Sequence, residues 1–589
     1  MATTIDESGR WRPWRRSNLL RGDRLLAAVA VAVAVYLLAP ALVLTGYSAF
    51  RAPADRLPFE SGAFWSVDNF VGIYTSGALL STLADTAVFV AGSVLLALVI
   101  GFVLAWLVER TDLPFRNAVF VLVLFPLMMP GLVTTMGWLL LLTERVGVLN
   151  VAVRAVLPFW EAGPFDVFSF YGMVVVQGFG LVALVFIFLS GVLRNVDPAL
   201  EEASRSSGAS TLTTLRWVTL PLLRPGILGV ALLSAILVVE SFEVPLLLAS
   251  GAGADIFSTR LYFALNDASG APPAYGTVGA MGLHFLVLTY GLFLLYHRFT
   301  GGADRYVTLT GRGYRPQRMA LGSWRWPLFV LVGLFLLVTS AAPFFVLVWT
   351  SLLPQYVQPS VDAIGRVSLS QYAAVLSDSR VLSAWLNTLL VAVAAPTISV
   401  LVALVIAWVV TRAKHAGGWQ VLLDLFLSSS IAIPGVVAAN AFLLFYLRVN
   451  HVVPLYGTVA VLVLVYAYRM AVVYRMDRAG VMQIAPELED ASDASGASPL
   501  QTFGRVVTPL MVPTLLGGWV LLFLVAFREF TLPLVVGRES PPFVVSVLIW
   551  KLWGQHAGQA AALSVLTVCF LAIALIALRL IAVRHFRRE

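Results

Sequence analysis

The sequence predicts an all-α polytopic membrane protein with about twelve transmembrane helices, arranged as two parallel six-helix repeats. Composition is the first reason, because 59% of the 589 residues are hydrophobic and only 12% are charged. A water-soluble protein needs more polar side chains to cover its surface, whereas lipid tails accept apolar ones. The other two reasons are a series of long apolar runs and an internal repeat in the sequence.

Twelve apolar runs are long enough to cross a membrane, because the hydrocarbon layer takes about 20 helical residues. They divide the chain into a tail (1–24), a first six-helix repeat (25–298), a linker (299–326) and a second six-helix repeat (327–589). The predicted spans are 25–50, 84–108, 117–142, 170–193, 225–249, 276–297, 327–352, 385–411, 420–446, 457–475, 513–537 and 561–583.

Arginines gather in the N-terminal tail, the linker and the C-terminus, which the positive-inside rule assigns to the cytoplasm. All three lie on one side of the membrane only if each half has an even number of spans. We therefore predict that both termini are cytoplasmic. The arginines are Arg10, Arg12, Arg15, Arg16, Arg21 and Arg24 in the tail, Arg298, Arg305, Arg312, Arg315, Arg318 and Arg325 around the linker, and Arg584, Arg587 and Arg588 at the C-terminus.

The sequence shows no sign of an enzyme or of a nucleic-acid-binding protein. The net charge is +8, but only two lysines are present and the arginines lie at the ends of apolar runs. A phosphate-binding loop needs Gly before Lys, whereas Lys414 follows Ala413 and Lys551 follows Trp550. Cys569 is the only cysteine, and the six histidines have no metal-ligand spacing. We therefore predict no catalytic residues, no metal site, no cofactor in this chain and no nucleic-acid partner.

The two halves repeat in sequence. Residues 198–208 read PALEEASRSSG and residues 486–496 read PELEDASDASG, an offset of 288 that also relates Pro221 to Pro509. Upstream, MPGLV at 129–133 matches IPGVV at 433–437 with an offset of 304, so the first half contains about 16 additional residues, which we place in 143–169. Six spans in each half give the repeats the same orientation and a pseudo-two-fold axis along the membrane normal.

The repeated segment resembles the EAA loop of the permeases of type I binding-protein-dependent ABC importers. That pattern is E-A-A, three residues, G, nine residues, I, one residue, L-P, and its spacing matches both copies. Ser204, Ser492, Asp490 and Thr508 depart mildly from it. An ordinary solvated loop that caps a helix remains the alternative. The resemblance implies that these residues couple the chain to ATPase subunits: Glu201, Glu202, Ala203, Ser204 and Gly208 in the first loop, and Glu489, Asp490, Ala491, Ser492 and Gly496 in the second.

Charged residues in predicted spans five and eleven are candidates for the translocation path or its gate. An ionisable side chain within a span is costly, and it usually faces the bundle interior or water. These segments, ESFEVPLLL and REFTLPLVV, also resemble the fifth helices of iron(III)-type permeases. A purely structural ion pair between the halves is the alternative interpretation. The candidates are Glu240, Phe242, Glu243, Arg528, Glu529 and Phe530.

Proline-glycine pairs are predicted to break spans three and nine. They are Pro130 with Gly131, and Pro434 with Gly435. Such breaks are tolerated in a membrane where they line a cavity, and a simple packing kink is the alternative.

Two permease repeats fused in one chain resemble the iron(III)/thiamine branch of the family. The resemblance implies an ATP-driven importer of the bacterial inner membrane that works by alternating access on cargo from an extracytoplasmic binding protein. It favours ferric iron, with thiamine, a polyamine or an aminoalkylphosphonate as alternatives. The implied partners are the lipid bilayer, the binding protein and two ABC ATPase subunits, as a homodimer, which bind ATP and Mg. An ion-coupled secondary transporter is the alternative of a different class.

Overall fold

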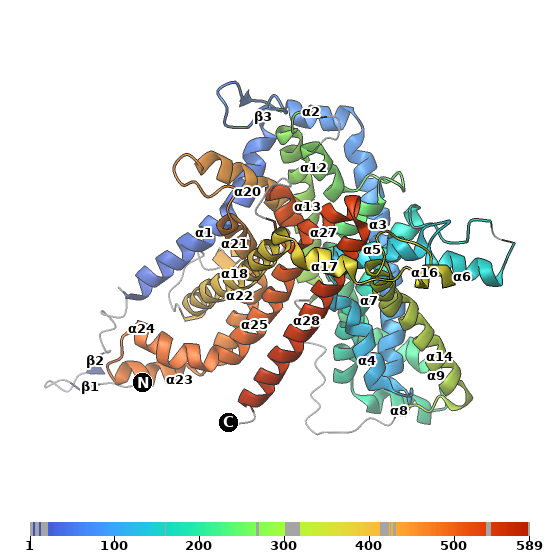
Figure 1. The fold of residues 1–589 in the computed structure, drawn as a ribbon. Coiled ribbons are helices and arrows are strands. Elements are labelled where there is room, and N and C mark those ends of the chain that lie inside the picture. The colour runs from blue at the N-terminus through green and yellow to red at the C-terminus, as the bar shows by residue number, and fades with distance from the viewer. Residues whose placement is uncertain are drawn as a thin grey trace. The chain divides into compact units, whose positions relative to one another are not determined.

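The computed structural model describes residues 4–5, 11–12, 22–159, 161–266, 270–300, 318–412, 423–424, 426–427, 432–537 and 543–586. Within them the chain is almost wholly helical, with two short antiparallel strand pairs (Figure 1). The chain forms two compact units. The larger unit comprises Leu44–Asn387, Pro434–Leu444 and Arg528–Glu589, and the smaller unit comprises Met1–Val43, Thr388–Ile433 and Phe445–Phe527.

The larger unit contains most of the first repeat, together with both ends of the second. Its elements are β3 (Arg51–Ala52), β4 (Phe64–Trp65), α2 (Asp68–Thr75), α3 (Ala78–Arg110), α4 (Arg116–Leu124), the 3-10 turn η1 (Phe125–Met128), α5 (Gly131–Leu142), α6 (Val148–Val156), α7 (Phe170–Asn195), α8 (Pro198–Ser206), α9 (Thr211–Thr214), the π-helical turn η2 (Leu215–Thr219), α10 (Leu220–Val239), α11 (Glu243–Leu248), α12 (Phe257–Leu265), α13 (Tyr275–Thr300), the 3-10 turn η4 (Gly322–Trp324), α14 (Arg325–Leu336), the π-helical turn η5 (Leu337–Ala341), α15 (Ala342–Ser351), α16 (Val361–Ile364), α17 (Ser370–Ser377), α26 (Thr531–Gly537), α27 (Val545–Gln555) and α28 (Ala557–Phe586).

The smaller unit contains most of the first helix and the middle of the second repeat. Its elements are β1 (Thr4–Ile5), β2 (Trp11–Arg12), α1 (Gly22–Ala49), α18 (Ser379–Arg412), α20 (Gly435–Val449), α21 (Val459–Ala467), the 3-10 turn η7 (Tyr468–Met470), α22 (Ala471–Gln483), α23 (Pro486–Ala494), α24 (Pro499–Thr502), the π-helical turn η8 (Phe503–Val507) and α25 (Thr508–Arg528). Of these helices, α1, α18, α20 and α25 contribute residues to both units.

The predicted spans agree with the structure in most places. Ten helices in the described part of the chain are long and apolar enough to cross a membrane, and the bent pair α4–α5 is an eleventh candidate. The run predicted at 420–446 falls partly outside the described residues, and only its end is seen as α20. The tail and the middle of the linker, with most of the arginines used to predict orientation, also lie outside the described residues or their described side chains.

The spans predicted at 225–249 and 513–537 are each interrupted in the structure. Helix α10 ends at Val239 and α25 ends at Arg528, and a short second helix follows each break. The cause is a proline in each second helix, because Pro245 and Pro533 lack the N–H that would bond the carbonyl four residues earlier. Hydroxyl groups occupy those carbonyls instead: Ser258 Oγ donates to Ser241 O at 2.6 Å, and Ser546 Oγ donates to Glu529 O at 2.7 Å.

The first helices of the two repeats are exchanged. In the larger unit, α15 of the second repeat packs on α5 of the first. The approach is close, since a Cβ atom on Gly137 would lie 2.5 Å from the carbonyl oxygen of Pro343. In the smaller unit, the Tyr36 hydroxyl of α1 lies 3.2 Å from the Tyr446 hydroxyl of the second repeat. Each repeat is therefore completed by a helix from the other.

Large apolar side chains cover the outer faces of the long helices. Examples are Leu80 (73% exposed) and Leu95 (64%) on α3, and Val330 (64%) on α14. Water would oppose such a surface, but a lipid environment accepts it, and the helices satisfy their own backbone hydrogen bonds. The exposed apolar faces therefore identify the lipid-facing sides of the bundle.

Candidate functional site

The first EAA loop folds into a helical hairpin, here called the first EAA hairpin (residues 197–219). The Asp197 carboxylate caps α8 by accepting from the Ala199 N–H at 2.9 Å. Helix α8 ends at Ser206, Gly208 follows with a left-handed φ of +86°, and the Ala209 N–H then donates to Ser204 O at 3.1 Å. Ser204 Oγ and Thr214 Oγ1 lie 2.9 Å apart and close the hairpin.

The second EAA hairpin (residues 485–507) repeats this geometry in the smaller unit. Gly496 has a φ of +79°, and the Ala497 N–H donates to Ser492 O at 3.2 Å. Ser492 Oγ and Thr502 Oγ1 lie 2.9 Å apart. The serines that depart from the family pattern thus take the same structural role in both copies.

The outer faces of both hairpins carry exposed apolar side chains at matching positions. Leu200 (43% exposed) corresponds to Leu488 (48%), and Leu212 (72%) corresponds to Leu500 (57%). Ala203 and Ala491 are exposed between them, as is Asp490, whereas Glu202 is half-buried. Small and apolar side chains beside an acid form a surface suited to a protein partner. The sequence analysis did not single out the leucines.

Glu201 and Glu489 turn inward, whereas Leu200 and Leu488 before them are exposed. In the first hairpin, Glu201 Oε1 lies 3.5 Å from Arg110 Nε and accepts from Thr219 Oγ1 at 2.9 Å. In the second, Glu489 accepts from Arg412 Nε at 2.7 Å and from Trp408 Nε1 at 3.0 Å. Both glutamates therefore bind the permease itself, which the prediction had not distinguished from contact with a partner.

Arg110 and Arg412 are functional candidates that the sequence analysis missed. Arg110 ends α3, and its Nη2 donates to the carbonyls of Leu193 (2.9 Å) and Val196 (3.1 Å) at the end of α7. Arg412 ends α18, and its Nη2 donates to the matching carbonyls of Val481 (3.1 Å) and Ile484 (2.8 Å). The signal was available, since AWLVER at 105–110 and AWVVTR at 407–412 repeat an A-W-x-x-x-R pattern.

The predicted gate residues lie at the breaks after α10 and α25. Phe242 and Phe530 are fully buried, and their ring centroids are 6.0 Å apart. Each ring also lies near an aromatic side chain of α12 or α27: the ring centroid of Phe242 is 5.4 Å from that of Tyr262, and the centroid of Phe530 is 6.1 Å from that of Trp550. The structure thus brings the equivalent aromatic residues of both repeats together.

The four charged candidates lie within two residues of this aromatic pair in the sequence and are half-buried: Glu240, Glu243, Arg528 and Glu529. Arg528 Nη1 donates to the carbonyl of Leu127, which precedes the break in the α4–α5 pair. Its charge also interacts with that of Glu243. The Glu243 carboxyl carbon would lie 3.4 Å from a Cβ atom on Gly131. Arg528 and Glu243 therefore both lie beside the broken span of the first repeat.

The proline-glycine pairs stand at equivalent helix starts. Pro130 is the N-cap of α5, which is bent by 104° from α4, and α20 begins at Gly435 immediately after Pro434. Each proline carbonyl accepts a hydrogen bond from the backbone N–H four residues later. Thr134 donates to Pro130 O at 3.0 Å, and Ala438 donates to Pro434 O at 2.9 Å. These pairs set the direction of the helix that follows.

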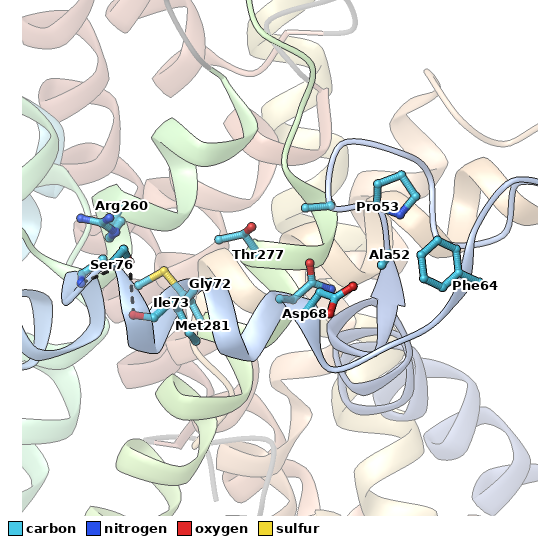
Figure 2. Close-up of a pocket in the computed structure, with 13 residues that line it drawn as sticks. Ala52, Pro53, Phe64, Asp68, Gly72, Ile73, Ser76, Arg260, Thr277 and Met281 are labelled. Atoms are coloured by element: carbon cyan, nitrogen blue, oxygen red, sulfur yellow. Dashed lines mark hydrogen bonds between the residues drawn. The ribbon is translucent and has the colours of Figure 1, made fainter.

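A cavity of about 490 Å³ lies at the other end of the first repeat, near the start of α3 (Figure 2). Helix α3 is roughly 50 Å long at 1.5 Å per residue, so this cavity is far from the first EAA hairpin. Its wall includes Asp68 of α2, Arg260 of α12 and Met281 of α13. Arg260 is held by the carboxylate of Asp255.

A family model described as "Binding-protein-dependent transport system inner membrane component" matches residues 97–303 and 366–589. The chain belongs to this family. It is therefore a fused permease with two family repeats, and a multi-pass protein of the inner membrane.

The relatives carry transport names. The permease is 25% identical over 527 residues to the ferric transport system permease protein FbpB of Actinobacillus pleuropneumoniae, covering 88% of this chain and 73% of that one. It is 26% identical over 500 residues to a probable ABC transporter permease protein of Sinorhizobium fredii, covering 83% of each. A putative ferric transport system permease of Haemophilus influenzae is 26% identical over 363 residues, covering 60% of this chain and 55% of that one.

Proposed function

We propose that this permease is the membrane subunit of an ATP-driven importer that takes ferric iron from an extracytoplasmic binding protein. The duplicated EAA hairpin carries the proposal. Its two copies have the same turn, the same serine-threonine closure and the same exposed leucines. Two equal surfaces in one chain suit two equal partner subunits, which in this function are a homodimeric ABC ATPase.

The ATPase supplies what the permease lacks. The chain has no phosphate-binding loop, so ATP and Mg are bound by the partner subunits and this chain needs no cofactor of its own. The hairpins then lie on the cytoplasmic side, which places both termini there. The binding protein docks at the opposite end of the bundle, where the cavity of Figure 2 opens.

The gate supports an alternating-access cycle. Phe242 and Phe530 are fully buried with ring centroids 6.0 Å apart, an arrangement that would close a transport path at this level. Helices α10 and α25 each follow directly from an EAA hairpin. Phe242 lies just after the end of α10, and Phe530 lies just after the end of α25. Movement of the hairpins by the ATPase would therefore separate the two rings.

Ferric iron is favoured over thiamine, a polyamine or an aminoalkylphosphonate by the names of the relatives. The half-buried carboxylates of Glu240, Glu243 and Glu529 beside the gate agree with a hard cation as cargo, because such cations prefer oxygen ligands. An ion-coupled secondary transporter would not need a pair of matched cytoplasmic hairpins.

Charge reversal at the hairpins tests the proposal. In the double variant Glu202→Lys, Asp490→Lys we expect the ATPase no longer to copurify. The two lysines would repel a basic surface of the ATPase, whereas the native acidic side chains attract it. The permease should remain folded by circular dichroism. The matched control is Asp55→Lys, Glu60→Lys, a double reversal of exposed acids outside the hairpins, which should keep the ATPase.

Retention of the ATPase by the hairpin variant would remove the coupling assignment. A wild-type permease that purifies without any ATPase, and whose iron uptake collapses with an ionophore, would establish the secondary-transporter alternative instead. Uptake of radiolabelled ferric iron by proteoliposomes, with thiamine and spermidine as competitors, tests the cargo separately.

A further inference from the structure

Each EAA hairpin is tied to the bundle by one arginine, and we call these sites the arginine clamps. The first clamp consists of Arg110, the carbonyls of Leu193 and Val196, and Glu201. The second consists of Arg412, the carbonyls of Val481 and Ile484, and Glu489. In each, one guanidinium joins three helices: the end of α3 or α18, the end of α7 or α22, and the start of α8 or α23.

We propose that Arg110 and Arg412 are positioning residues that make each EAA helix move as one body with two membrane-spanning helices. This inference rests on the proposed function, because the clamps would pass the movement of the ATPase subunits to the membrane-spanning helices. Without them, the side-chain contacts of α8 and α23 described above would be the serine-threonine closures and one hydrogen bond to each glutamate, from Thr219 to Glu201 and from Trp408 to Glu489.

The burial of the clamps argues for a directional role rather than simple stabilisation. The Arg110 and Glu201 side chains are 7% and 13% exposed, and those of Arg412 and Glu489 are 21% and 14% exposed. A buried ion pair costs desolvation energy, and an apolar pair of similar size would hold the helices at least as well. A guanidinium, however, fixes both distance and angle, because its donors form a rigid planar fork.

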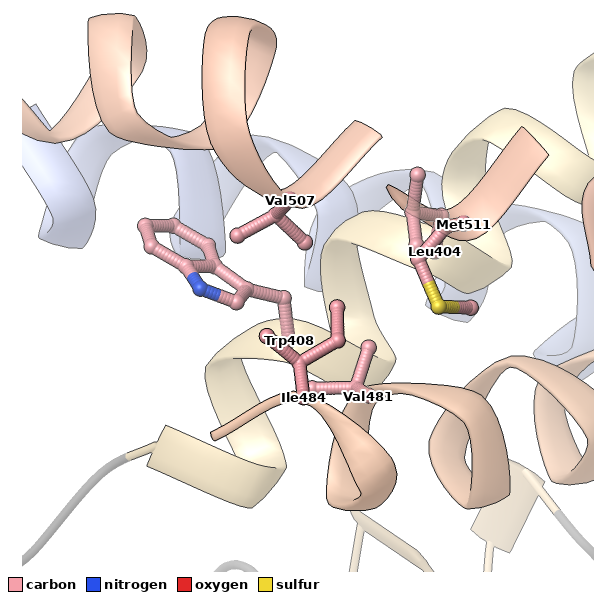
Figure 3. Packing of buried hydrophobic residues seen from close by; sticks show 6 residues of the cluster. All are labelled: Leu404, Trp408, Val481, Ile484, Val507 and Met511. Carbon is pink, nitrogen blue, oxygen red and sulfur yellow. The ribbon is translucent and has the colours of Figure 1, made fainter. Parts of the chain in front are cut away.

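A packed apolar cluster supports the second clamp (Figure 3). Trp408 lies beside Val507, with Val481 and Ile484 at the end of α22 close by. The same tryptophan donates its Nε1–H to Glu489 and packs against Phe503, with tilted ring planes and a centroid distance of 5.1 Å. Glu489 is therefore held by two residues of α18, and one of them, Trp408, lies in the buried cluster.

The first clamp is supported differently. Thr219 replaces the apolar Val507 and donates to Glu201, and the end of the linker adds a further contact. The Met319 N–H donates to Arg110 O at 3.0 Å, and Thr211 Oγ1 donates to the Met319 sulfur at 3.2 Å. Distinct supporting residues thus surround the same arginine-glutamate arrangement in both repeats.

Transport per ATP hydrolysed is the measurement that tests the clamps. The full complex of the Arg412→Gln permease with its ATPase is placed in proteoliposomes. Glutamine keeps a planar hydrogen-bond donor but removes the positive charge. We expect the ATPase to stay bound and to hydrolyse ATP, while transport per ATP falls about five- to tenfold, in the range typical of a lost coupling interaction. Arg412→Lys should recover part of the coupling, and exposed Arg366→Gln should behave as wild type.

A second variant guards against misfolding. Glu489→Gln has nearly the same shape as the native residue and should uncouple in the same way, whereas exposed Glu144→Gln should not. Normal transport per ATP in both Arg412→Gln and Glu489→Gln would overturn the inference while leaving the proposed function intact. A wild-type permease that binds no ATPase would overturn both. Equal loss of ATPase binding, ATP hydrolysis and transport would reduce the clamps to a structural role and overturn the inference alone.

Discussion

The two repeats can be compared at the EAA hairpins and at the gate segments after α10 and α25. In the hairpins the copies share the left-handed glycine, the serine-threonine closure and the arginine clamp. In the gate segments the backbone is shared, with the same serine hydroxyl on the freed carbonyl, but the charges differ. At the same offset of 288, Glu240 corresponds to Arg528.

This difference shows which parts of the permease must be equal and which are free to differ. Two identical ATPase subunits would impose the same surface on both hairpins. The gate segments have no such constraint, because no repeated partner surface is proposed for them. A negative charge in one repeat, such as Glu240, can then correspond to a positive charge in the other, such as Arg528.

The largest expected effect breaks the symmetry of the aromatic pair. Phe242→Ala and Phe530→Ala should each lower the free energy of unfolding by about 3–5 kcal/mol, the usual cost of removing a buried ring. Because the rings contact each other, the double variant should cost less than the sum. Unfolding in detergent measures this, with Phe345→Ala, whose ring is 62% exposed, as the control. A large cost in only one copy would show that the two phenylalanines are not equivalent.

A smaller effect is expected from the unequal charges of the gate. Arg528→Gln should reduce transport about tenfold, equivalent to about 1.4 kcal/mol, because Glu243 and the Leu127 carbonyl lose their cationic neighbour. The complex should stay assembled, so the loss is read from uptake by complexes with a normal ATPase content. Arg366→Gln, at an exposed arginine, is the control. Wild-type uptake by the Arg528→Gln variant would show that this arginine has no role in transport.

The smallest effect sharpens the likeness of the hairpins. Gly208→Ala and Gly496→Ala should each cost roughly 1 kcal/mol of stability, since a Cβ atom disfavours the left-handed conformation. The two costs should agree, because nothing lies within 4 Å of either glycine to add a clash. Gly504→Ala is the control, at a glycine with equal space but without a positive φ, and it should not destabilise. Unequal melting temperatures for the two hairpin variants would show that the hairpins are strained differently.

Much of the architecture was predictable because lipid imposes simple rules on sequence. Long apolar runs gave the helices, and the repeated PALEEASRSSG and PELEDASDASG segments gave the two hairpins and their family. Glycine at the end of α8 and α23 indicated the turn that follows, because few other residues adopt a positive φ.

Other features depended on residues far apart in the chain. The breaks at Glu240 and Glu529 are stable because hydroxyls from α12 and α27 reach the carbonyls that Pro245 and Pro533 leave free. No local pattern reveals which hydroxyl will arrive there. The exchange of α1 and α15 between repeats is likewise a matter of packing, since both helices are apolar on most sides.

The amino-acid sequence alone determined that this protein is a duplicated helical permease, because apolar runs and internal repeats follow from the order of the residues and need no knowledge of tertiary contacts. Tertiary structure alone decided which acid of each EAA helix binds Arg110 or Arg412. Neighbouring acidic residues look alike in a sequence. Their different roles arise from the helical rotation of about 100° between successive residues, which turns Glu201 and Glu489 toward the bundle, leaves Asp490 exposed and leaves Glu202 half-buried.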